Sequence, residues 1–122
     1  MLSEPDNLSV GVLVRPAILL LLREQESHGY EVMRRLHALG VAVPPDAANV
    51  YRLLRTMDDD GLVESYWTTP AVGPARRMYI LTPVGEQHLE HSMMGLSGLL
   101  DTVNDMLIRY HGDDTRRRAR GT

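Results

Sequence analysis

The chain has 122 residues, of which 43% are hydrophobic and 24% charged, with a net charge of −3 and no cysteine. This predicts one compact folded domain with a short tail, and excludes two separate domains or a wholly disordered chain. Disulfides, cysteine nucleophiles and thiolate zinc sites are excluded too. The longest uncharged apolar run, Ala17 to Leu22, is too short to span a membrane. Because Glu4 and Asp6 are unlike the basic start of a signal peptide, we expect a cytoplasmic protein without a membrane partner.

All 13 basic residues are arginine. The planar fork of arginine donors fits phosphate oxygens and guanine edges, although the codon bias of a GC-rich genome gives the same composition. The negative net charge argues against indiscriminate polyanion binding. A local basic face remains compatible with it, because binding responds to the nearby field.

Two helices are predicted first. Pro16 suits the first turn of a helix over Ala17 to Glu24, and the apolar stretch Leu8 to Val14 either extends this helix or crosses the core. Ser27 is expected to cap a second helix, from about His28 to Leu39, that stops at Gly40.

The third helix is predicted over Ala47 to Asp60, after the turn and cap Pro44-Pro45-Asp46 and before Gly61. Its sequence separates two faces at helical spacing. The apolar stripe consists of Val50, Leu53, Leu54 and Met57, and the opposite face carries Ala48, Arg52, Arg55 and Asp59, with Asn49 and Tyr51 on the flanks.

A hairpin follows. Leu62 to Thr68 and Arg76 to Leu81 are predicted strands, joined by the loop Thr69 to Ala75, which is rich in proline and glycine.

The last helix begins at Thr82-Pro83 and is expected to run to about His111. Its apolar residues repeat at spacings of four and three, which is typical of a helix that pairs with another helix. The expected dimer interface is Leu89, Met93, Leu96, Leu100, Val103, Leu107 and Tyr110, with Leu99 and Met106 widening it. The predicted organisation is a head over residues 1–82, a dimerisation helix over 83–112 and a basic, disordered tail over 113–122.

Three helices followed by a hairpin predict a winged helix-turn-helix head, so the fold class is mainly α (α+β) with a two-stranded wing and a long C-terminal helix. In this arrangement the third helix enters the major groove and the hairpin reaches the adjacent backbone or minor groove. From Arg34 to Arg77 there are six arginines and five acids, a weak local excess of positive charge. A winged helix that binds protein instead of operator DNA is the alternative from another class.

Three blocks resemble the PadR family of transcriptional regulators. His28-Gly29-Tyr30-Glu31 is similar to the HGYE signature, and Tyr51-Arg52-Leu53-Leu54 followed by Gly61-Leu62-Val63 is similar to the recognition-helix block. The segment from Gly73 to Gly85 resembles the wing and the turn after it, GPxRxxYxLTxxG. Met57-Asp58 departs mildly from the usual Leu-Glu.

The resemblance implies a homodimeric repressor of the small subfamily, with one C-terminal dimerisation helix. A two-fold dimer would present two third helices to a pseudo-palindromic operator. No cofactor and no enzymatic activity are expected, since no catalytic set or phosphate loop is visible. The candidate DNA-binding residues are Asn49, Tyr51, Arg52 and Arg55 on the third helix and Arg76 and Arg77 on the wing. The competing interpretation of the helix residues is a solvated face, and one wing arginine could pair with Glu64 instead.

Other residues allow a second kind of regulator. His88 and His91 could hold a divalent metal but fit a solvated helix face better. The methionines of the last helix could line an effector pocket, although core packing is simpler. Because Trp67, the only tryptophan, lies in the hairpin, the flat aromatic drugs that related regulators stack on a helical tryptophan are not expected to bind.

Overall fold

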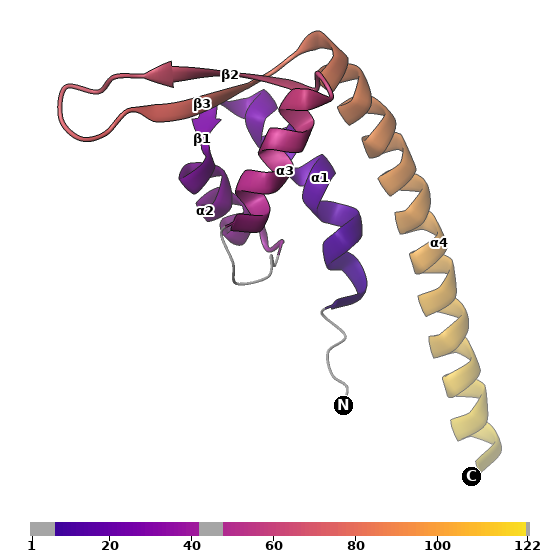
Figure 1. Cartoon of the computed structure of the whole chain (residues 1–122). Coiled ribbons are helices and arrows are strands. Elements are labelled where there is room, and N and C mark those ends of the chain that lie inside the picture. The colour runs from indigo at the N-terminus through magenta and orange to yellow at the C-terminus, as the bar shows by residue number, and fades with distance from the viewer. Residues whose placement is uncertain (1–6, 42–47, 122) are drawn as a thin grey trace. The chain divides into compact units, whose positions relative to one another are not determined.

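The structure, a computed structural model, describes residues 7–41 and 48–121. Its elements, in chain order, are α1 (Asn7–Glu24), β1 (Ser27–His28), α2 (Gly29–Leu39), α3 (Ala48–Asp59), β2 (Val63–Thr68), β3 (Arg76–Leu81) and α4 (Pro83–Gly121) (Figure 1). The chain divides into two compact units between Glu90 and His91. The first turns of α4 therefore belong to the head unit, which ends later than the predicted boundary after residue 82.

Helix α1 includes the stretch from Leu8 to Val14, so this segment extends the helix. Pro16 consequently lies inside α1, and the prediction that it begins the helix is wrong. Its ring nitrogen cannot donate to the Val12 carbonyl one turn earlier, which costs the helix one hydrogen bond. Burial of Ala17, Ile18, Leu21 and Leu22 compensates for this loss.

The cap of α2 differs from the prediction by one residue. His28 is the N-cap, and its Nδ1 accepts a hydrogen bond of 3.2 Å from the Glu31 backbone N–H. Ser27 is instead buried in a two-residue strand, β1, that no sequence pattern predicted. Arg35 ties α1 to α2, because its guanidinium donates to the Leu21 carbonyl at 2.9 Å and to Ser27 Oγ at 2.8 Å.

Helix α3 has the predicted apolar stripe. Val50, Leu54 and Met57 are fully buried, and Leu53 is partly exposed. The helix is described from Ala48, because Ala47 and the expected turn and cap at Pro44-Pro45-Asp46 lie outside the described residues.

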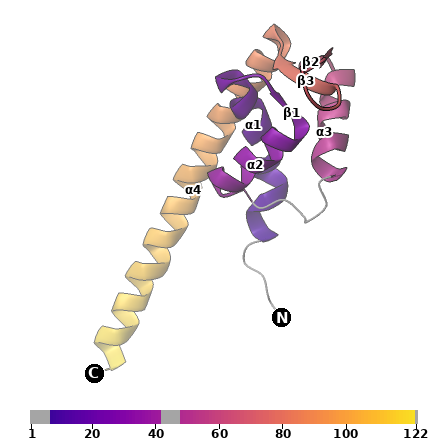
Figure 2. The same ribbon diagram turned by 90° about the vertical axis from the view of Figure 1, so that its left-hand side faces the viewer.

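The three strands form one antiparallel sheet in the order β1-β3-β2, so the predicted hairpin is confirmed and β1 is added to it. Across the hairpin, Trp67 pairs with Arg77 and Ser65 with Tyr79, whereas β1 pairs only with Met78 and Tyr79. Figure 1 shows the hairpin projecting beyond α1, α2 and α3, and Figure 2 shows these helices gathered beside the sheet.

The head has one core to which α1, α2, α3 and the hairpin all contribute. Its fully buried side chains are Ile18, Val32, Leu36, Val50, Leu54, Met57 and Val63. At about 25 cal/mol per Å² of apolar area removed from water, this burial is the main force that fixes α3 beneath the sheet.

The start of α4 is anchored to the turn between α3 and β2. Thr82 Oγ1 accepts from the Gly85 N–H at 3.0 Å, and the Thr82 N–H donates to the Leu62 carbonyl at 3.1 Å. A Cβ on Gly85 would lie 2.0 Å from that carbonyl oxygen, so only glycine fits here. Leu89, one turn further, is 3% exposed. It belongs to the core of the head, and its assignment to the dimer interface is wrong.

The second unit is the remainder of α4. The helix continues to Gly121, so the prediction of a disordered tail from residue 113 is wrong. The i,i+4 ion pair between Arg117 and Asp113, with its nitrogen and oxygen 3.7 Å apart, supports this last stretch. No helix in the described part of the chain combines the length and the hydropathy that a membrane span requires.

Candidate nucleic-acid interface

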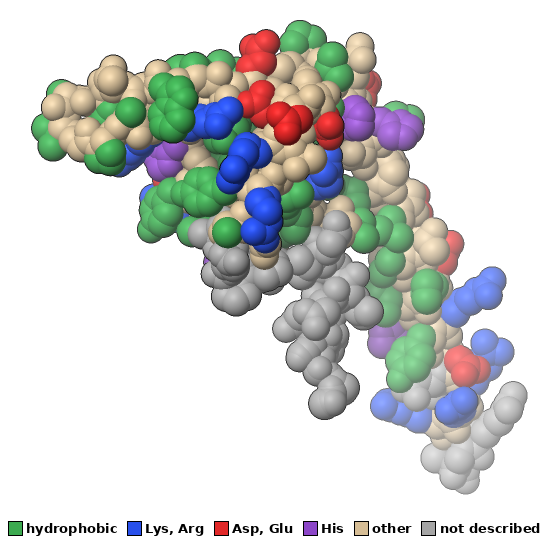
Figure 3. Space-filling view, viewed as in Figure 1, with side chains coloured by type: hydrophobic (Ala, Val, Ile, Leu, Met, Phe, Trp, Pro, Cys, Tyr) green, Lys and Arg blue, Asp and Glu red, His purple; other side chains and the backbone are tan. Residues whose placement is uncertain are grey.

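The outward face of α3 presents the side chains that the sequence predicted. Tyr51 is 38% exposed, and Arg52 and Arg55 are exposed beside it. The buried stripe on the other side of α3 fixes this orientation, because a helix that buries one face against a core turns the opposite face to solvent. Figure 3 shows arginine side chains in blue along this helix and below the hairpin.

Two of the predicted residues contact each other. Arg52 Nη2 donates a hydrogen bond to Asn49 Oδ1, across one turn of the helix. An asparagine binds the edge of an adenine through both the amide donor and the amide acceptor of its side chain. The hydrogen bond from Arg52 to Asn49 must therefore break before Asn49 can bind an adenine. Arg55 makes no hydrogen bond or ion pair with any described residue.

Arg77 is held inside the head. Its Nη2 lies 3.3 Å from Asp58 Oδ2 on α3, and its Nε donates to Ser65 Oγ on β2 at 3.0 Å. Ser65 Oγ donates in turn to the same Asp58 oxygen at 2.6 Å. This network joins the hairpin to α3, and the pairing with Glu64 that the sequence left open is absent among the described residues.

Two aromatic rings enclose the Arg77 guanidinium. Its central carbon lies 6.0 Å from the Trp67 ring centre and 5.8 Å from the Tyr79 ring centre, within the range of cation–π contact. Burial raises the pKa of the Tyr79 hydroxyl, partly opposed by the positive charge of Arg77. These contacts leave Arg77 less able to reach a DNA phosphate than Arg76, which is exposed.

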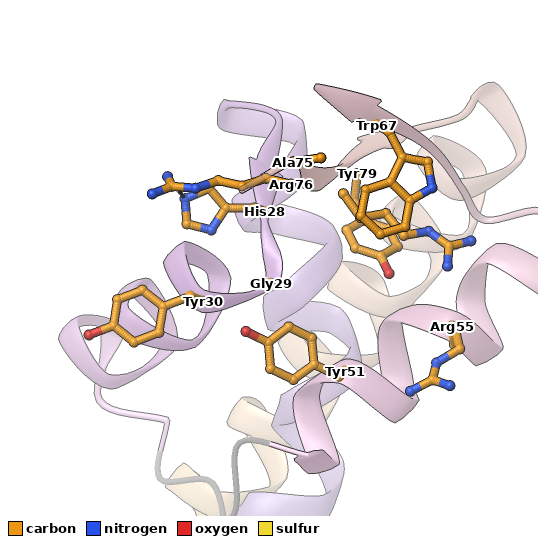
Figure 4. A pocket seen from close by; sticks show the side chains of 10 residues that line it. His28, Gly29, Tyr30, Tyr51, Arg55, Trp67, Ala75, Arg76 and Tyr79 are labelled. Atoms are coloured by element: carbon orange, nitrogen blue, oxygen red, sulfur yellow. Dashed lines mark hydrogen bonds between the residues drawn. The ribbon is translucent and has the colours of Figure 1, made fainter. Parts of the chain in front are cut away.

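A groove of about 470 Å³ lies between α2, α3 and the hairpin. Figure 4 shows the side chains around it. It is lined by His28, Gly29, Tyr30, Tyr51, Arg55, Trp67, Ala75, Arg76, Arg77 and Tyr79. This set contains three arginines, four aromatic rings and no carboxylate, so the groove combines positive charge with flat apolar walls.

Gly29 sets the position of Tyr51 in this groove. A Cβ on Gly29 would lie 2.2 Å from Tyr51 Cε1, so the ring rests directly against the α2 backbone. The position of Tyr51 on α3 thus depends on the glycine of the His28-Gly29-Tyr30-Glu31 block.

At the other side of the groove, Arg76 Nη1 lies 3.1 Å from His28 Nε2 (Figure 4). His28, Tyr30, Trp67 and Tyr79 were not among the predicted site residues. The pairing of Trp67 with Arg77 follows from the hairpin register, but the approach of His28 to Arg76 depends on β1, which left no sequence signal.

The metal alternative gains no support from the geometry. Within the described residues, no three His, Asp or Glu side chains are grouped closely enough to hold an ion, and His88 and His91 are two exposed residues on α4.

A helix with exposed arginines beside a β-hairpin, on a head of three helices, defines the DNA-binding winged-helix class. The PadR-like family of transcriptional regulators matches residues 18–91, and the chain belongs to this family. None of the curated proteins compared with the chain matches it.

Solved structures agree with this assignment. A PadR-like transcriptional regulator from Bacillus cereus is 29% identical, with a TM-score of 0.71 over 83% of this chain and 96% of the other. A PadR-like transcription factor from Bacteroides fragilis is 27% identical, with a TM-score of 0.65 over 82% of this chain and 94% of the other. PadR of Bacillus subtilis, solved in complex with operator DNA, is 28% identical, with a TM-score of 0.59 over 66% of this chain and 46% of that longer chain.

Proposed function

We propose that this chain is a homodimeric repressor that acts in the cytoplasm and binds a pseudo-palindromic operator through α3 and the hairpin wing. The observation that carries the proposal is the outward face of α3, where Tyr51, Arg52 and Arg55 are exposed together beside the groove. The operator complex of the Bacillus subtilis relative supports DNA as the ligand.

The charges on this face favour a nucleic acid over a protein partner. Of the arginines in the head, Arg35 and Arg77 are bound by neighbouring elements, and three others form ion pairs, Arg15 with Asp60, Arg23 with Glu86 and Arg34 with Glu31. Arg52, Arg55 and Arg76 remain directed at solvent on or next to the groove. Arginines around a groove whose lining contains no carboxylate suit phosphates and guanine edges, whereas a protein interface usually has an apolar centre.

The dimer is proposed from the apolar surface of α4. Leu100, Val103, Leu107 and Tyr110 are between 40% and 66% exposed in the single chain, and they repeat at spacings of three and four residues. A second copy of the same helix matches this repeat along its length, and a two-fold pair would present two α3 helices to two half-sites.

The test uses the DNA upstream of the gene, where an autoregulated operator would lie, in gel-shift titrations. Arg52→Ala or Arg55→Ala should weaken binding by about 1–3 kcal/mol if that side chain contacts a base edge. Arg34→Ala removes the same charge from α2 and is the matched control. If Arg52→Ala and Arg55→Ala both bind as tightly as the control, α3 is not the recognition helix.

A further inference from the structure

In the contact between His28 and Arg76, the two nitrogens that face each other are both hydrogen-bond donors. His28 Nδ1 accepts from the Glu31 N–H at the start of α2, so this nitrogen carries no hydrogen. A neutral imidazole has one N–H, and here it must therefore be on Nε2. Arg76 Nη1, 3.1 Å from Nε2, is always a donor as well.

Two donors cannot bond to each other. They can both be satisfied by one acceptor that lies within reach of both nitrogens, and an oxyanion is the acceptor that arginine and an imidazole N–H bind best. The pair lies in the groove, whose lining residues include Arg55 and Arg77 but no carboxylate, so the side chains that line the groove provide no anionic acceptor.

The groove is open along its length. Tyr30 and Trp67 are 54% and 66% exposed, so its walls do not close over a small molecule. An open groove that carries positive charge suits a polymer that passes through it. Tyr51 of α3 lines the same groove, which makes the groove continuous with the candidate recognition face.

We propose that His28 Nε2 and the Arg76 guanidinium together bind one phosphate group, and that this phosphate belongs to the DNA backbone. The assignment of the phosphate to DNA rests on the proposed function. The binding of a phosphate by His28 and Arg76 rests instead on the contact between these two side chains. It gives the His28-Gly29-Tyr30-Glu31 block a role in binding in addition to capping α2, and it separates Arg76, which binds phosphate, from Arg77, which supports the wing.

Two substitutions separate binding from folding. His28→Asn retains an N-cap oxygen, since asparagine is among the best capping residues, but it lacks the donor at the position of Nε2. Arg76→Gln removes the charge of an exposed side chain. Arg109→Gln, on α4 outside the head, is the control for loss of one positive charge. Far-UV circular dichroism and thermal unfolding verify that each variant is folded.

Binding is measured on the upstream duplex and on a random duplex over a series of salt concentrations. Each groove variant should lose about tenfold in affinity on both duplexes, because a phosphate carries no sequence. Arg76→Gln should also reduce the slope of log affinity against log salt by about one, whereas His28→Asn should leave the slope unchanged because it removes no charge. The double variant should lose less than the product of the two single losses, because both residues bind one phosphate.

Neutral methylphosphonates placed singly along the upstream duplex identify the contacted phosphate. One position in each half-site should weaken the wild-type protein and leave Arg76→Gln unaffected. Wild-type affinity in both groove variants, or independent losses in the double variant, would overturn the site while the proposed function stands.

A second arm separates the two proposals. Inorganic phosphate and adenosine monophosphate are titrated into the wild-type protein and Arg76→Gln, and the His28 ring resonances are followed by NMR. If the wild-type protein binds no duplex but its His28 resonances shift with phosphate and those of Arg76→Gln do not, the phosphate chemistry holds and both its DNA source and the regulator proposal fail. If neither duplex nor phosphate binds, both proposals are overturned.

Discussion

Because Gly29 on α2 has no side chain, the Tyr51 ring of α3 can lie against the α2 backbone. The ring of Tyr51 occupies the space that a Cβ on Gly29 would need. Glycine is therefore required at this position by the close approach of a side chain from another helix, and not by a turn. The requirement links two sequence blocks that lie more than twenty positions apart.

We predict that Gly29→Ala moves the Tyr51 ring out of the groove and weakens operator binding by about 1 kcal/mol, the typical value of one hydrogen bond. Thermal stability should change little, because Tyr51 is exposed enough to rotate and alanine favours the helix. The control is a double-mutant cycle with Tyr51→Ala. Adding Gly29→Ala to Tyr51→Ala should cost no further affinity, and a full additional loss would show that Gly29 acts independently of Tyr51.

Among the contacts between elements, those of Asp58 connect α3 to the hairpin. It binds Arg77 and Ser65, and these residues lie on the two strands of the hairpin. The side chains of Asp58 and Arg77 are 24% and 38% exposed, so the ion pair is only partly screened by solvent. The connection restricts the angle between the hairpin and α3, the two elements that we propose to contact the same duplex.

We predict that Asp58→Asn lowers the stability of the head by about 1 kcal/mol, a value discounted for partial exposure. It should also lower the ratio of operator affinity to random-duplex affinity. Removal of a negative charge strengthens binding to both duplexes, because both have a phosphate backbone. A less firmly held hairpin weakens binding to the operator only, because only that complex depends on the angle between the hairpin and α3. Asp59→Asn makes the same charge change at an exposed neighbour. Equal effects of the two substitutions on both duplexes would contradict a specific role for Asp58.

The sequence predicted the helices and strands better than the contacts between them. The stripe of α3 and the turn residues of the hairpin are local signals, and both were correct. Strand β1 was missed because two residues hold no periodicity and because Ser27 also looks like a helix cap. Arginine counts could not separate Arg35, which holds α1 to α2, from Arg55, which faces solvent. That difference depends on carbonyls and hydroxyls brought together by folding.

At the scale of the whole molecule, the heptad repeat of α4 contains two kinds of position. Leu89 has the spacing of the repeat but is 3% exposed within the head, whereas Leu100 is 59% exposed and Leu107 is 49% exposed. A repeat read from sequence cannot distinguish these cases, because both place an apolar residue on the same face of a helix. The proposed dimer surface therefore begins after Leu89, and its members are Met93, Leu96, Leu100, Val103, Leu107 and Tyr110.

The dimer is tested by placing charge on this surface. The helix has 39 residues and is about 58 Å long at 1.5 Å per residue. An exposed apolar strip along such a helix is unfavourable in water unless a partner covers it. We predict that Leu96→Glu with Leu100→Glu converts the protein to monomers and abolishes tight operator binding, because two copies would bring four carboxylates together. Sedimentation velocity and gel shifts measure the two effects.

The matched control adds the same two carboxylates elsewhere on α4, through Gln87→Glu and Thr102→Glu, which lie outside the repeat. The control protein should remain dimeric and bind its operator in one cooperative step, since its apolar strip is intact. Its head should also bind DNA with the ordinary salt dependence, because neither substitution touches α3 or the wing. A wild-type protein that sediments as a monomer at micromolar concentration would contradict the dimer, and operator recognition would then have to rest on one α3 and one half-site.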